Sequence, residues 1–356
     1  MGFSFRVVCT LLLAWLAAQV CIALHTPLPW MIGPLLATSF ASMRGAPTLS
    51  WNPFRDVGQW VIGTALGLYF TPQVTALVVG LWWAIGLGIV WALMLGFVFG
   101  RWLHWVHAPR MDGLDRATTY FAGPIGGASE MTLLAERAMA RTDLVASAHS
   151  LRVLIVTVVV PFIMQFSGWH GIDVAPALVR QWDWQGLALL ALCTGAGAGA
   201  MKLMQRPNPW FLGPFLVAMV LTMQEVTLSG IPAWLTNTAQ MVIGVSLGVR
   251  FTASFVQTAP RWLASVALAT VVMIVACAGF AEGLAWLTGL PLATMMLGTS
   301  PGGIAEMAIT AKVLQLGVAV VSAFQVCRLV AILLLVQPLY GWLYLKKRDV
   351  QTPSAS

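Results

Sequence analysis

An internal duplication constrains the fold of this chain more than any other feature of its sequence. Four blocks recur in the same order at offsets of 176 to 181 residues: PWMIGP at 29–34 and PWFLGP at 209–214, QWVIG at 59–63 and QMVIG at 240–244, GGASEM at 126–131 and GGIAEM at 302–307, and Arg152 and Arg328. Blocks that repeat in a fixed order predict a duplicated structural unit. We therefore expect two related halves, a first membrane repeat over 7–167 and a second over 185–345.

The composition places both halves in a lipid bilayer. Of the 356 residues, 59% are hydrophobic and 9% are charged, whereas a soluble chain carries about 25% charged residues. No charged stretch is long enough to solvate a separate domain, which argues against a soluble catalytic domain and against direct binding of nucleic acid. The apolar run at 7–24 has a counterpart at 185–201, so we expect a retained helix there and not a cleaved signal peptide.

The apolar runs predict an all-α polytopic membrane protein. They cover 7–24, 29–43, 57–70, 73–100, a broken 117–140 and 143–167 in the first half, and 185–201, 209–223, 237–252, 262–288, a broken 292–316 and 318–345 in the second. Several of these runs are shorter than the roughly 20 residues that a helix needs to cross the hydrocarbon core. Such short runs indicate helices that lie against protein rather than lipid.

Lysine and arginine residues decide between two topologies, because they are enriched in cytoplasmic loops. If the broken runs re-enter the membrane, each half has five spans and the halves are inverted. Arg152 and Arg328 are set aside as intramembrane charges, and in this inverted topology only Arg180 and Lys312 lie outside. If the broken runs cross, the halves are parallel and seven lysine and arginine residues lie outside. We therefore predict inverted 5+5 spans in a bacterial inner-membrane protein, with both termini cytoplasmic.

Two breaks at matching positions carry the strongest functional signal. The segments GPIGG at 123–127 and SPGG at 300–303 contain Pro124, Gly126, Gly127, Pro301, Gly302 and Gly303. Proline and paired glycines interrupt a helix and leave backbone groups unpaired. At membrane depth such backbone is tolerated only where it lines protein or a water-filled cavity. Broken helices in both halves are typical of transporter binding sites, and the alternative interpretation is a pair of packing kinks.

Four charged residues recur near these breaks. Arg152 and Arg328 lie close to the middle of their apolar runs, where an arginine costs roughly 2.5 to 3.5 kcal/mol. Glu130 and Glu306, one turn into the helices after the breaks, are their natural partners. Two hypotheses remain open. Either each half holds a structural ion pair, or the arginines leave their carboxylates and bind an anionic substrate beside the positive helix ends.

The remaining motifs indicate packing. Gly63 with Gly67 and Gly244 with Gly248 form GxxxG pairs, which predict close helix packing and permit a homodimer. The tryptophan in each PW block is interpreted as a hinge or interfacial anchor rather than a ligand contact. The five histidines and five cysteines form no metal or nucleophile pattern. We therefore expect no cofactor, no metal site and no enzymatic activity.

The repeated blocks resemble those of the duplicated membrane AbrB family of Gram-negative bacteria, which is unrelated to the soluble DNA-binding protein of the same name. The resemblance covers about 7–345, and SPGG followed by Arg328 is its most specific part. The first half has GPIGG instead, so we expect a differently shaped first break. Family members are labelled regulators of gene expression, and some ammonia monooxygenases, although this sequence shows no helix-turn-helix and no metal constellation.

These observations leave three functional hypotheses. The preferred one is an inner-membrane, transporter-like protein that binds a small anionic solute between its halves by alternating access. Glu130 and Glu306 would then neutralise the arginines or carry coupled protons. The second is a membrane-embedded regulator of gene expression that acts indirectly, by sensing or exporting a metabolite, as the resemblance implies. The third is a structural or assembly protein, which would need only the packing motifs.

Overall fold

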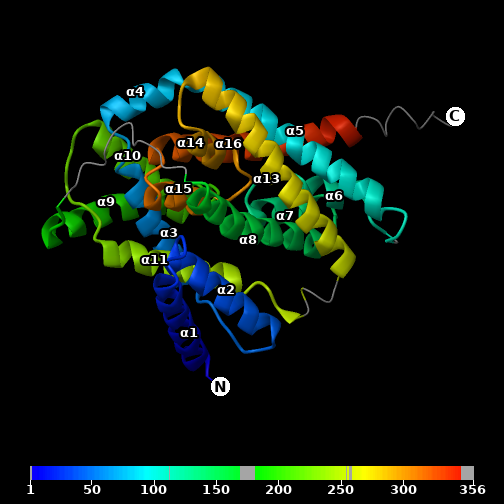
Figure 1. Cartoon of the computed structure of the whole chain (residues 1–356), viewed down its shortest axis with the longest axis horizontal. Helices are drawn as coiled ribbons and strands as arrows, with labels where there is room; N and C mark the ends of the chain where they lie inside the picture. The colour runs from blue at the N-terminus through cyan, green and yellow to red at the C-terminus, as the bar shows by residue number, and fades with distance from the viewer. Residues whose placement is uncertain (1, 112, 169–180, 254, 256–258, 346–356) are drawn as a thin grey trace.

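The computed structural model describes residues 2–111, 113–168, 181–253, 255 and 259–345, and all regular secondary structure within these ranges is helical (Figure 1). Arg180, Lys346, Lys347 and Arg348, which enter the charge count above, lie outside the described residues. The helices before residue 169 are α1 (Phe3–Ala23), α2 (Pro29–Met43), α3 (Asn52–Gly67), α4 (Pro72–Gly80), α5 (Trp82–His107), α6 (Arg116–Ala122), α7 (Ala128–Arg137) and α8 (Thr142–Phe166). Those after it are α9 (Trp184–Leu203), α10 (Pro209–Met223), α11 (Ala233–Gly248), α13 (Pro260–Thr288), α14 (Leu292–Thr299), α15 (Ile304–Val313), α16 (Val318–Tyr340) and the π-helical turn η1 (Gly341–Leu345).

Six of these helices are long and apolar enough to cross a membrane. They are α1, α5, α8, α9, α13 and α16 with its extension into η1, and the bent pair of α3 and α4 is a seventh candidate. Their outer faces carry exposed apolar side chains, among them Leu12, Leu192 and Val275. Because such faces are stable only in hydrocarbon, the chain is a multi-pass membrane protein.

The structure divides one run that the sequence presents as continuous. The predicted run 73–100 consists of α4 and α5, which are separated at Leu81, and α4 is turned by 89° from α3. Pro72 cannot extend α3, because it lacks the backbone N–H that a helix interior needs. Instead it begins α4, where the Thr71 hydroxyl accepts a hydrogen bond from the Val74 amide at 3.4 Å. A proline preceded by a capping threonine is favoured at a helix start.

Four shorter helices of 15 or 16 residues connect the two parts of the chain: α3 packs against α10, and α2 packs against α11. Glycines allow these close approaches. A Cβ atom at Gly63 would collide with the carbonyl oxygen of Phe211, and one at Gly244 would lie 2.6 Å from that of Met31. The close packing predicted from the GxxxG pairs is therefore confirmed. Because both pairs are occupied within the chain, a homodimer stays a prediction that would need another surface.

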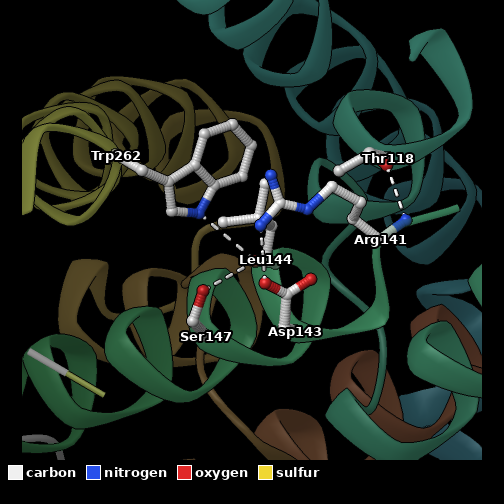
Figure 2. Close-up of polar contacts among 6 residues, drawn as sticks. All are labelled: Thr118, Arg141, Asp143, Leu144, Ser147 and Trp262. Carbon is white, nitrogen blue, oxygen red and sulfur yellow. Dashed lines mark hydrogen bonds and ion pairs between the residues drawn. The ribbon is translucent and has the colours of Figure 1, made fainter. Parts of the chain in front are cut away.

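A hydrogen-bonded junction fixes the start of α8 (Figure 2). The Arg141 amide donates to the Thr118 hydroxyl of α6 at 2.8 Å, and the buried indole of Trp262 on α13 donates to the Leu144 carbonyl at 3.2 Å. These bonds join three helices at one end of α8. The junction matters for the site because α8 carries Arg152. Of the six candidate spans, α8 and α16 are the two that are most enclosed by other helices.

Candidate functional site

Both predicted helix breaks are present in the structure. Helix α6 ends at Ala122 and α7 begins at Ala128, while α14 ends at Thr299 and α15 begins at Ile304. Gly127 and Gly303, the residues before the second helix of each pair, have extended backbone. The carbonyl groups at the ends of α6 and α14 therefore have no donor from a following helical turn, and they need donors from elsewhere.

Arg152 supplies these donors at the first break. Its side chain is 1% exposed, and its Nη1 and Nη2 atoms donate to the carbonyl oxygens of Gly123 at 3.0 Å and Pro124 at 2.8 Å. Nη2 also lies 2.6 Å from Nδ1 of His149, one turn earlier on α8. The planar guanidinium suits this task, because its fork of donors can hold two acceptors at once.

Arg328 donates to the open carbonyl groups at the second break. Its side chain is 4% exposed; Nη1 donates to the Ser300 carbonyl at 2.6 Å, and Nη2 donates to the Gly302 carbonyl at 2.7 Å. Nη2 also donates to Oε1 of Gln325 at 2.6 Å. The two breaks differ in sequence, as GPIGG and SPGG, yet an arginine from the following long helix holds the open carbonyls of each.

His149 and Gln325 are functional-site residues that the sequence interpretation missed. His149 Nε2 lies 2.9 Å from the Phe121 carbonyl oxygen, and Gln325 Nε2 donates to the Leu297 carbonyl at 2.7 Å. The sequence held a signal, because His149 and Gln325 are separated by 176 residues, as Arg152 and Arg328 are. Comparison by identity alone could not detect it, since imidazole and carboxamide differ in type while offering one donor and one acceptor each.

The hypothesis of a structural ion pair within each half is wrong. Among the described residues, ion pairs form only between Arg55 and Asp56 and between Arg141 and Asp143. The carboxylates of Glu130 and Glu306 instead lie against the glycine three residues earlier. A Cβ atom added to that glycine would collide with the carboxylate. A carboxylate over the first turn of a helix is stabilised by the positive helix end. The glutamate carboxylates therefore stabilise the first turns of α7 and α15, whereas the arginine side chains donate to the carbonyl groups at the breaks.

A cavity of about 370 Å³ lies between the two breaks. Nine of the ten residues predicted for the site line it: Gly126, Gly127, Glu130, Arg152, Pro301, Gly302, Gly303, Glu306 and Arg328. Pro124 is absent from the lining and contributes its carbonyl to Arg152. The cavity thus brings together segments about 176 residues apart. Its two sides are unequal, because Glu306 is buried whereas Glu130 is partly exposed.

Several other residues that line the cavity had been given different roles in the sequence interpretation. Arg55 and Arg250, counted as loop charges that orient the spans, both line the cavity, as does Asp56. Pro209 and Trp210 also line it, so the second PW block reaches the cavity, and its interpretation as a hinge or interfacial anchor stays a prediction. The apolar periodicity of a single helix does not reveal which of its ends faces a cavity formed by distant segments.

The charges of the lining act on one another. Burial lowers the pKa of the Arg250 guanidinium, and the positive charge of Arg55 lowers it further, whereas the carboxylates of Glu306 and Glu130 raise it. Four arginines face three acidic residues in this lining, so the ionised cavity has an excess of positive charge. Within the described part of the chain, no three metal-ligating side chains come together.

The two buried arginines each retain an unused donor. Nε of Arg152 and Nε of Arg328 are buried, and neither has a hydrogen-bond partner among the described residues. A buried N–H without an acceptor costs about 1–3 kcal/mol. The same unmet donor occurs at both matched positions, in residues that line one cavity, and the described residues provide no acceptor for either.

The described residues thus form a multi-span helical membrane protein in which two broken helix pairs line one cavity. Residues 30–344 match the family described as "Transition state regulatory protein AbrB", so the chain belongs to the membrane AbrB family. It is 28% identical over 319 residues to "Putative regulator AbrB" of Escherichia coli (strain K12), covering 88% of this chain and 89% of that protein. It is also 26% identical over 346 residues to "Uncharacterized protein YhjN" of Bacillus subtilis (strain 168), covering 88% and 87% of the two chains.

Proposed function

We propose that this protein is a bacterial inner-membrane transporter that binds a small anionic solute in the cavity between its two breaks. The observation that carries the proposal is the pair of buried guanidinium groups, Arg152 and Arg328, which line one cavity and each keep an unpartnered Nε–H among the described residues. An anion with carboxylate or phosphate oxygens could accept from both, because guanidinium groups and oxyanions form strong charge-assisted hydrogen bonds.

The chemistry of the site favours an anion over a neutral solute or a cation. Each guanidinium has five N–H donors and no acceptor, and the Nη bonds to the break carbonyls leave Nε–H without a partner among the described residues. The first turns of α7 and α15 also face the cavity, with their partial positive charge. The carboxylates of Glu130 and Glu306 cover these helix ends, so a bound anion would compete with them.

The proposal includes two inverted halves with ten spans. Six long helices are joined by the four shorter ones, α2, α3, α10 and α11. At 1.5 Å per residue, 15 or 16 residues extend about 22–24 Å, less than the roughly 30 Å of the hydrocarbon core. Short helices of this kind would let water reach the centre. Both termini would be cytoplasmic, the α6–α7 and α14–α15 pairs would re-enter, and access would alternate as one half moves against the other.

Transport by the purified protein in proteoliposomes tests the proposal. We expect uptake of at least one labelled anion from a panel of monocarboxylates, dicarboxylates and inorganic phosphate. Arg250→Gln is the informative variant, because Arg250 lines the cavity without holding a break, and we expect it to lower the uptake rate by about tenfold or more. Arg141→Gln, at an arginine outside the cavity, is the matched control. No flux of any anion in either direction would contradict transport.

A second candidate is a membrane-embedded regulator that acts on gene expression indirectly. Its support is the description of the family and the name of the Escherichia coli relative. The two functions are compatible if expression responds to the transported solute. They separate in a deletion strain: expression restored by wild type and by Arg250→Gln alike would indicate regulation without transport, whereas restoration by wild type alone would link expression to the solute.

A further inference from the structure

A second cavity, of about 470 Å³, lies where α5 ends and α6 begins. Its wall includes Arg101, Trp102 and Trp105 from α5, Arg116 from α6, and Tyr344 from η1. None of these residues lines the cavity between the breaks. The second cavity is therefore a separate site, with two positive charges and several aromatic side chains.

The position of Arg101 along α5 places this cavity at the level of the lipid headgroups. Residues 82–100 contain no charged side chain, and 19 residues of helix extend about 28 Å, close to the hydrocarbon thickness. Arg101 is the first charge after this stretch, and Trp102 and Trp105 follow within the next turn. Tryptophan is enriched at this depth, where one side of the ring contacts acyl chains and the other side contacts water.

The two arginines of this cavity have no partner among the described residues. Both are exposed, and neither guanidinium forms a hydrogen bond or an ion pair with any described residue. The neighbouring Asp115 carboxylate accepts from the Thr118 amide at 2.7 Å instead. Arg116 is the first residue of α6, an end at which a positive side chain is unfavourable. Helix stability therefore does not explain its presence there.

We propose that this cavity binds the headgroup of an anionic glycerophospholipid, with the phosphate between Arg101 and Arg116. The wall continues into the exposed side chains of Val98 and Trp105, along which the glycerol and the first acyl carbons can lie. This apolar continuation favours a lipid over free phosphate, which would leave it uncovered. Basic pockets beside membrane helices recognise anionic lipid headgroups by the same combination of charge and depth.

Native mass spectrometry and thermal unfolding in one neutral detergent test this site. We expect the wild-type protein to retain added phosphatidylglycerol and unfold at a higher temperature with it, and to do neither with phosphatidylcholine. Arg101→Gln with Arg116→Gln should weaken phosphatidylglycerol binding by about tenfold or more, since both charge-assisted contacts are lost. The matched control, Arg44→Gln with Arg141→Gln, makes the same change in net charge at exposed positions outside the cavity.

Three outcomes would overturn the proposal: equal retention of phosphatidylcholine, undiminished phosphatidylglycerol binding by the cavity variant, or equal loss in the control. Equal stabilisation by inorganic phosphate would assign the site to a free anion. Trp105→Ala provides a second test if the double variant folds poorly. This side chain is 75% exposed, so its removal should leave the fold intact and weaken phosphatidylglycerol binding several-fold while sparing any phosphate binding.

Discussion

The imidazole of His149 links the guanidinium of Arg152 to the end of α6. Nδ1 lies 2.6 Å from Nη2 of Arg152, and Nε2 lies 2.9 Å from the Phe121 carbonyl oxygen. A guanidinium only donates and a carbonyl only accepts, so Nε2 carries the proton, Nδ1 accepts, and the ring is neutral. Gln325 makes the equivalent pair of bonds with its amide, to Arg328 and to Leu297.

This equivalence predicts that His149→Gln leaves the stability of the protein nearly unchanged. A glutamine can accept from Arg152 and donate to the Phe121 carbonyl, as Gln325 does in its own network. His149→Leu can do neither, and should lower the free energy of unfolding by about 1–3 kcal/mol through unsatisfied buried groups. Unfolding in detergent, followed by circular dichroism, measures both variants. Equal damage by glutamine and leucine would show that the hydrogen bonds of His149 do not determine its role.

The contact of α3 with α10 predicts that alanine substitutions at two glycines have different effects on stability. Gly63→Ala places a Cβ against the carbonyl of Phe211 and should destabilise the protein by about 1–3 kcal/mol. Gly86→Ala on α5 meets no atom within 4 Å and should be neutral or stabilise by up to about 1 kcal/mol. Paired thermal unfolding curves test this expectation, which fails if the two variants shift the midpoint in the same direction by similar amounts.

Glu306 provides a test of whether the cavity carries protons. Glu306→Gln keeps a side chain that can cover the start of α15 but removes a negative charge from the cavity. If the transport proposal holds, the variant should bind the anion several-fold more tightly. If Glu306 carries the coupled proton, exchange of solute should persist while uptake driven by a pH gradient is lost. Glu136→Gln, at an exposed glutamate outside the cavity, is the control; identical behaviour of the two variants would exclude a special role for Glu306.

Cysteine labelling tests whether the broken pairs re-enter. Gly113 precedes α6, and Met139, which is 91% exposed, follows α7. In a chain whose five native cysteines are replaced by alanine, Gly113→Cys and Met139→Cys should react with a membrane-impermeant maleimide from the same side. Gly289→Cys and Gln315→Cys, which flank the α14–α15 pair, should both react from the opposite side. Labelling of Gly113→Cys and Met139→Cys from opposite sides would instead support the parallel topology.

Local sequence predicted the helices and their breaks well. The starts of α7 and α15 are confirmed, because proline and paired glycines act within one helical turn. The same locality explains the errors. The predicted run 73–100 divides into α4 and α5 at Leu81, and hydropathy does not register this division because it lies inside an apolar run. The partners of Arg152 were misjudged because opposite charge suggested Glu130, whereas the open carbonyls lay 28 and 29 residues earlier.

By itself the sequence determined that the chain is a helical membrane protein, that related blocks recur in it, and that arginine and glutamate accompany each break. These properties depend on composition and on the order and spacing of short blocks along the chain. Only the tertiary structure decided that both breaks line one cavity, that Arg250 and Trp210 join it, and that Nε of Arg152 and Nε of Arg328 stay without a partner among the described residues. Such features depend on which helices pack together, and a local pattern such as GxxxG predicts close packing without specifying the distant segment that packs there.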